Sequence, residues 1–281
     1  MERSFVSGKA LALSVATAVV ADRMTAISGE ELSARAYLLG GLPLAVGMMI
    51  LTAFVMNSGV FCGDSLLSRF GQAGLLLWSA AELVFAVRDA QTIGWQQFSS
   101  MAVIGILPAL LWAGWSLPSD VLSRSAKILW VLVAAGGVIF VVGLLGQFQW
   151  ENLLETTMVN LNRISKIKIP FYAEYFVLAF FSTEETTREM TRKIGVLPLG
   201  AFLLEGGCRI GMELLFGAAE RYPGYELLRA WTLGMFSRFD SFFLLVWLAA
   251  GLFRICLLTR ILRSLTERFS AEALPGGEVQ S

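Results

Sequence analysis

Runs of apolar residues, separated by short polar links, recur along the whole chain. The clearest run covers residues 236–258, where aliphatic and aromatic side chains are interrupted only by Arg238, Asp240 and Arg254. An apolar helix of about 20 residues matches a hydrocarbon core about 30 Å thick. A helix also satisfies its own backbone hydrogen bonds in that medium. We therefore predict a membrane-spanning helix here, with its charged residues towards the two ends.

Seven further apolar segments precede this run, and together they predict an all-α fold, a polytopic membrane helix bundle. We expect one transmembrane domain over residues 1–269 and a flexible tail over residues 270–281, which contain proline and paired glycines. The eight predicted segments are residues 10–21, 36–56, 73–87, 100–117, 128–148, 169–181, 194–219 and 236–258.

Two of these segments are short for a helix that spans a bilayer. For residues 10–21 the alternative is a cleaved signal peptide, because small residues end the run. For residues 169–181 two interpretations stay open. The segment is either half of a discontinuous helix, with residues 151–164 as the other half, or a complete but short and tilted helix. Broken helices occur at membrane depth where they line a cavity.

Proline and glycine residues mark an expected helix start and expected helix contacts. Residues 118–127 predict an interfacial helix, because Pro118 suits a helix start and Asp120 would lie in the first turn. Glycines in two apolar segments would allow close approach of neighbouring helices. These glycines are Gly136, Gly137, Gly143, Gly146, Gly207 and Gly211.

Arginines follow the last apolar run and indicate its orientation. Arg260, Arg263 and Arg268 lie beyond it, and Glu267 is the only acid among them. Cytoplasmic flanks of membrane helices carry such an excess of Lys and Arg. We predict an integral membrane protein whose C-terminus is cytoplasmic, and an even number of segments places the N-terminus on the same side.

Composition narrows the functional classes. Hydrophobic residues make up 56% of the 281 residues, charged residues only 16%, and mean hydropathy is +0.66. The formal net charge is zero, so nucleic acid is not an expected partner. The chain has no histidine, which removes the commonest general base and metal ligand. Its cysteines, Cys62, Cys208 and Cys256, are isolated, so we expect neither a disulfide framework nor a metal site.

No nucleotide-binding, hydrolase or metalloprotease motif stands in the sequence. We therefore predict no catalytic residues, no cofactor and no enzymatic activity. A membrane enzyme that uses carboxylates remains the weakest alternative, since no pair of acids has a supporting context.

Charges within segment seven are the first candidates for a binding site. Glu205, Arg209 and Glu213 are spaced by four residues and so share one helical stripe. Charges inside a membrane are costly and face protein or water. They form either an internally neutralised ladder or a contact for a ligand's carboxylate or ammonium group.

Glu174 is the better single candidate, because it stands one turn after Pro170 in a short apolar helix. Proline favours the first helical position, and the free amides after it can face an anion or a water-filled cavity. The alternative is a carboxylate paired with Lys166, Lys168 or Arg209. Elsewhere in the chain, Glu82 is predicted to hydrogen-bond inside the bundle.

The C-terminal run also carries a family likeness. Tyr222-Pro223, a short amphipathic helix, Arg238-Phe239-Asp240 and a span containing Trp247 follow one another. This order resembles the spore germination permease family, the membrane-spanning B subunits of nutrient germinant receptors. That family belongs to the amino acid/polyamine/organocation transporter superfamily. Further matching pieces, in the same order, are Ser7-Gly8-Lys9, Val87-Arg88-Asp89, Trp150-Glu151-Asn152-Leu153-Leu154 and Ile169-Pro170-Phe171-Tyr172-Ala173-Glu174.

The resemblance implies an inverted-repeat transporter fold of ten helices, broken in helices one and six, in the inner spore membrane or the cell membrane. This chain has about eight segments, so the repeat would be truncated. The implied partners are membrane lipid, a small nutrient such as an amino acid, and the germinant receptor A- and C-type subunits. We expect a divergent subunit that senses or passes a nutrient to trigger germination; a non-transporting scaffold for sporulation partners is the alternative. The expected ligand-binding residues are Pro170, Tyr172, Glu174, Glu205 and Arg209.

Overall fold

The computed structural model describes residues 8–26, 34–57, 65–97, 100–154, 171–176, 195–217 and 239–273. All regular elements in these ranges are helices, so the predicted all-α class is confirmed for them. The helices are α1 (Gly8–Ala26), α2 (Ala34–Asn57), α3 (Leu66–Gln97), α4 (Ser100–Ser116), α5 (Ser119–Leu144), η1 (Leu145–Gln147), α6 (Trp150–Leu154), α9 (Leu197–Phe216) and α11 (Phe239–Ala273).

Among the described helices, four are long and apolar enough to cross a membrane, which indicates a membrane protein. The spans are Ala34–Met56, Leu66–Thr92, Asp120–Gln147 and Leu245–Glu267, and a shorter apolar helix covers Gly105–Ser116. Helices α1 and α9 have 19 and 20 residues, yet each includes charged side chains that lower its hydropathy. The predicted total of about eight spans and the inverted repeat therefore stay predictions.

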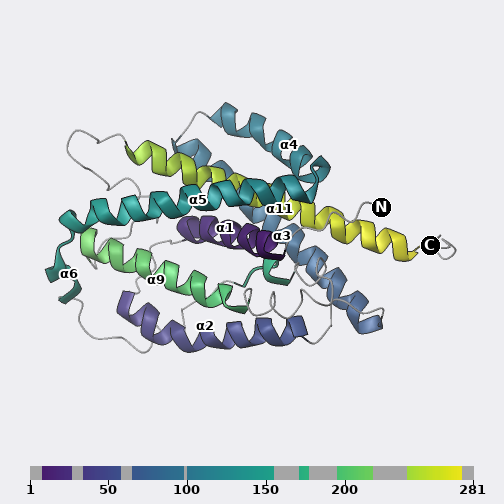
Figure 1. Ribbon diagram of the computed structural model, residues 1–281, viewed down its shortest axis with the longest axis horizontal. Coiled ribbons are helices and arrows are strands. Elements are labelled where there is room, and N and C mark those ends of the chain that lie inside the picture. Colours follow the sequence, from purple (N-terminus) through teal and green to yellow (C-terminus); the bar gives the residue numbers. More distant parts are fainter. Residues whose placement is uncertain are drawn as a thin grey trace.

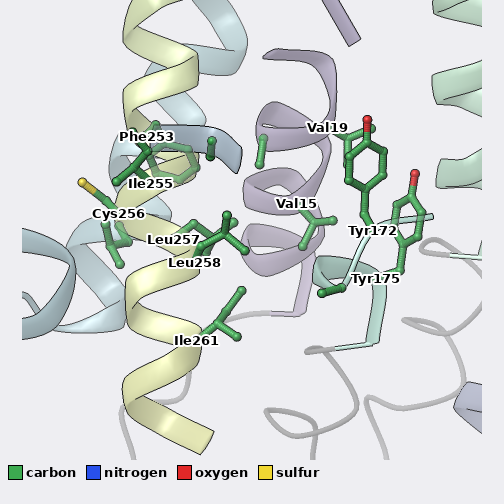
Figure 2. Close-up of a cluster of buried hydrophobic side chains, with 14 of the residues drawn as sticks. Val15, Val19, Tyr172, Tyr175, Phe253, Ile255, Cys256, Leu257, Leu258 and Ile261 are labelled. Atoms are coloured by element: carbon green, nitrogen blue, oxygen red, sulfur yellow. The ribbon is translucent and has the colours of Figure 1, made fainter. Parts of the chain in front are cut away.

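Helix α1 lies at the centre of the described bundle. It packs against α5, α9 and α11 (Figure 1). Figure 2 shows Val15 and Val19 of α1 beside Tyr172 on one side, while Leu257 and Leu258 of α11 lie on the other. Val15 and Val19 are almost fully buried. This central packing of an alanine- and valine-rich helix favours a structural segment over a cleaved signal peptide.

Helix α11 is the longest element described and contacts α1, α3, α4 and α5. Its 35 residues extend about 50 Å, at 1.5 Å per residue. A continuous buried stretch runs from Phe253 to Thr259 and includes Arg254. The expectation that Arg254 marks the end of the apolar run is wrong. The helix and its apolar span continue to Ala273 and Glu267, and this places Arg254 in mid-span.

Helix starts follow the local sequence signals. Pro118 precedes α5 in an extended conformation, and Asp120 lies in the first turn, as predicted. The predicted interfacial helix and segment five form one continuous helix rather than two. Helix α9 has a proline in its first turn and ends at Gly217, whose φ of 81° lies in the left-handed region that favours glycine.

Glycines make close helix contacts at positions other than those predicted. A side-chain carbon added at Gly114 of α4 would lie 2.6 Å from the carbonyl oxygen of Cys256 in α11. At Gly137 and Gly207, which were expected to sit in helix contacts, nothing lies within 4 Å of that position. These two glycines border open space instead, so close approach of a neighbouring helix does not explain why glycine stands there.

Candidate functional site

Arg254 is the centre of a buried group of charged side chains. Its Nε donates to Glu174 Oε1 at 2.8 Å. Its two terminal nitrogens donate to Asp22 and to Glu82, so each guanidinium nitrogen serves a different carboxylate. The three carboxylates come from α1, from α3 and from residues 171–176. Arg254 therefore connects three segments that lie far apart in the sequence to α11.

Arg23 forms a second centre one residue after Asp22. Its Nη2 donates to Asp22 Oδ2 at 2.8 Å, and its Nη1 donates to Glu205 Oε2 at 3.0 Å. Its Nε donates to the hydroxyl oxygen of Tyr172, and that hydroxyl donates to Asp22 Oδ2 at 2.5 Å. Asp22 also accepts from Arg254 of α11, and Arg23 also donates to Glu205 of α9, so two adjacent charges of α1 bond each other and connect two neighbouring helices.

The ring of Tyr172 lies between the two arginines. The Cζ atoms of Arg23 and Arg254 are each 5.2 Å from its centroid, a distance at which the ring face attracts a guanidinium group. Tyr172 therefore contacts both cations through its ring and Asp22 through its hydroxyl. It positions the two halves of the charged group relative to one another.

Helix α9 extends the network. Glu205 Oε1 accepts from Nε and Nη2 of Arg209 at 3.2 and 3.0 Å, so the predicted i, i+4 contact is confirmed. Arg209 also lies over the ring of Tyr37 in α2, at 4.5 Å from its centroid. Glu213, the third member of the predicted ladder, accepts instead from the backbone N–H of Ala34 at 2.5 Å.

We call these charged residues the central ion cluster. None of their side chains is more than 14% exposed. Burying charge requires pairing, and the arginines here supply it. When all are ionised, the carboxylates outnumber the guanidinium groups by one. The cluster consists of Asp22, Glu82, Glu174 and Glu205 with Arg23, Arg209 and Arg254.

A small pocket of about 30 Å³, here called the acidic pocket, adjoins the cluster. Asp22, Asp89 and Arg254 line it together with Trp247. This volume holds about two water molecules. Asp89 accepts no hydrogen bond from the residues that the structure describes, so its carboxylate is available to a bound group. Trp247 closes one side, where its indole Nε1 donates to the carbonyl oxygen of Ala21 at 3.0 Å.

Four of the predicted site residues meet in this network, namely Tyr172, Glu174, Glu205 and Arg209. Pro170 lies outside the described residues, as do Lys166 and Lys168, both expected as partners of Glu174. The first half of the proposed discontinuous helix also lies mostly outside them. Glu82 forms the hydrogen bond inside the bundle that was predicted for it.

The ligand-binding role of Glu174 stays a prediction, and its side chain forms a buried pair as the alternative interpretation expected. Its side chain is fully buried, and Oε1 is held by Arg254 rather than by Arg209. Its Oε2 has no hydrogen-bond partner among the described residues. Glu174 thus lies in packed protein beside the acidic pocket but does not line it.

Sequence reasoning missed three members of the cluster. Asp22 and Arg23 come directly after the predicted segment 10–21, and Arg254 was expected towards one end of the last apolar run. For Arg254 the signal is the length of the flanking helix, because α11 continues well beyond it; Asp22 and Arg23 lie near the end of α1 and carry no such signal. A charge with apolar helix on both sides predicts a buried partner.

Replacing Tyr172 with phenylalanine tests its positioning role. The change removes the hydroxyl that bonds Asp22 and Arg23, and we expect a loss of about 2 kcal/mol in the free energy of unfolding. Tyr175→Phe is the matched control, because that hydroxyl is buried and has no described partner. Unfolding in detergent should separate the two variants. If the two variants had the same free energy of unfolding, the positioning role of Tyr172 would be contradicted.

No group of three or more Cys, Asp or Glu side chains in the described residues is arranged to hold a metal ion. Comparison of the chain with protein-family models, with curated proteins and with solved structures found no match.

Proposed function

We propose that the chain is a membrane-embedded receptor or permease subunit that binds a small amine-containing nutrient beside the central ion cluster. The observation that carries this proposal is the three-carboxylate environment of Arg254 in the middle of an apolar span. Buried ion pairs add little to stability relative to apolar packing, while intramembrane charges commonly serve ligand or ion binding. A role in binding therefore explains the presence of these buried charges better than a contribution to folding stability does.

The charge balance favours a cationic group on the ligand. When all its groups are ionised, the described cluster has one carboxylate more than it has guanidinium groups, and Asp89 adds a further carboxylate beside it. An ammonium group has three donors and no acceptor, so it suits a site bordered by Asp22 and Asp89. A ligand carboxylate would find Arg254 already occupied by three acids.

The acidic pocket would have to enlarge to admit a nutrient. Ligand pockets usually have volumes of several hundred Å³, compared with the 30 Å³ here. Trp247 stands at its wall and is fixed by one hydrogen bond, so movement of this side chain is the smallest change that opens it. The geometry therefore supports binding that is coupled to a conformational step, as a sensor requires.

The resemblance to germination permeases gives this proposal its biological setting. We propose an amino acid as the nutrient, A- and C-type receptor subunits as the partners, and the inner spore membrane as the location. The likeness includes Asp89 and Glu174, and both lie at or beside the acidic pocket.

Binding to the reconstituted protein tests the proposal. A panel of amino acids and nucleosides should contain a ligand whose affinity falls about tenfold or more in Asp89→Asn, because a charged hydrogen bond is lost. Folding should be unaffected, since Asp89 bonds no described residue. Asp120→Asn, at an exposed carboxylate on α5, is the control and should bind normally. If no compound binds, or if Asp89→Asn binds as the wild type does, the proposed site is wrong.

A non-transporting scaffold is the second candidate. It is favoured by the complete burial of Glu174 and its bond to Arg254, a geometry that also suits a fixed structural contact. This candidate predicts that the protein co-purifies with other sporulation membrane proteins. It also predicts that neutralising Asp89 changes neither that assembly nor any ligand response.

A further inference from the structure

A second pocket is separate from the acidic pocket and holds no member of the ion cluster. It has a volume of about 480 Å³ and is bordered by α1, α5, α9 and α11. We call it the apolar pocket. No charged side chain lines it, and its walls are formed by aliphatic, aromatic and glycine residues together with the thiol of Cys208. It is not the nutrient site proposed above, because it offers no partner for an ammonium or carboxylate group.

Two of its glycines show that the pocket is real free space on the helix surfaces. A side-chain carbon added at Gly137 of α5 or Gly207 of α9 would meet nothing within 4 Å. A carbon added at Gly136, one residue earlier, would lie 3.7 Å from Phe243, which also lines the pocket. The absent side chains at Gly137 and Gly207 therefore leave room that another apolar group can fill.

Part of the pocket lining is exposed at the surface of the described helices. Val141 of α5 and Leu203 of α9 line the pocket and are each 53% exposed, and Val141 lies within the membrane span Asp120–Gln147. Such a surface is covered by hydrocarbon chains in a bilayer. A chain lying over Val141 would be next to Leu144 and Phe140, which line the same pocket and are buried.

We propose that the apolar pocket binds the acyl chain of a membrane lipid. The volume falls within the usual range for a bound small molecule, the lining matches hydrocarbon, and an exposed lining residue, Val141, lies in a membrane span where acyl chains are present. This inference is independent of the proposed nutrient-binding function.

The bound chain would contact a residue shared with the acidic pocket. Trp247 and Ala21 line both pockets, and the indole bonds the carbonyl oxygen of Ala21. The acyl chain therefore packs against the side of Trp247 that faces away from Arg254. Occupancy holds the indole against α1 and keeps the wall between the two pockets closed.

Fluorescence quenching by brominated lipid tests the site. The full chain is reconstituted in phosphatidylcholine vesicles, either plain or brominated on the acyl chain, and tryptophan emission is compared. Subtracting the emission of Trp247→Phe isolates the contribution of Trp247. We expect brominated lipid to abolish most of that contribution, while a water-soluble quencher leaves it intact because Trp247 is only 6% exposed.

A variant whose added side chain fills the apolar pocket provides a second, independent test of lipid binding. Gly207→Leu directs a side chain into the free space and should restore part of the emission that brominated lipid quenches. Gly200→Leu is the matched control on the same helix, because its added side chain also meets nothing but lies outside the pocket. The proposal is overturned if brominated lipid leaves the Trp247 emission unchanged, or if Gly207→Leu is quenched as fully as Gly200→Leu.

Discussion

Arg254→Met should lower the free energy of unfolding by about 5 kcal/mol and reduce the yield of folded protein in the membrane. The substitution keeps a long side chain but removes the cation that Asp22, Glu82 and Glu174 share. Breaking one buried pair costs about 3–5 kcal/mol because it leaves a buried charge uncompensated. Here three carboxylates lose the same partner, so the cost lies at the upper end of that range, which is a large part of the stability of a typical domain, about 5–15 kcal/mol.

The measurement is thermal unfolding in detergent together with the yield of monodisperse protein. Arg124→Met is the matched control, because Arg124 pairs with Asp120 at 2.6 Å on an exposed part of α5. Exposed pairs contribute at most about 1 kcal/mol, so this variant should unfold almost as the wild type does. Equal behaviour of the two variants would mean that Arg254 has no central role.

Gly114→Leu is expected to separate α4 from α11. Even the first added carbon would lie 2.6 Å from the carbonyl oxygen and 2.9 Å from the Cα of Cys256. Both atoms belong to the backbone of a long helix, so relief requires movement of a whole element. Overpacking of this kind costs about 3 kcal/mol, at the upper end of the usual range.

Gly105→Leu in the same helix is the control, because its added side chain meets nothing within 4 Å. It should leave the unfolding temperature unchanged or raise it slightly, since leucine favours a helix more than glycine does. Hydrogen exchange at α4 would report the separation directly. A Gly114→Leu protein with wild-type protection there would show that the two helices do not depend on this contact.

Helices were predictable from the sequence because each apolar run carries its own length and boundaries. The predicted residues 36–56 and 100–117 correspond closely to α2 and α4. Boundaries failed where a polar residue was taken as a helix end. Helix α3 extends from Leu66 to Gln97, well beyond the predicted residues 73–87. In α11 buried ion pairs make Arg254 acceptable inside the helix, and a single sequence does not reveal its partners.

The candidate site was predictable only in part for the same reason. Spacing alone identified the contact of Glu205 with Arg209, because both stand on one helix. Pairs between elements, such as Arg23 with Glu205 and Arg254 with Glu174, depend on how the helices pack. The sequence indicated which residues would be costly to bury, but the arrangement of α1, α9 and α11 decides how they are neutralised.

A double-mutant cycle between Arg254 and Glu174 tests the central ion cluster most directly. The unfolding free energy is measured for Arg254→Met, for Glu174→Gln and for the double variant. If the buried carboxylate and guanidinium depend on one another, the double variant will be more stable than the sum of the two single losses predicts, by about 1–3 kcal/mol. Strictly additive losses would show that the two side chains do not interact, and would contradict the cluster.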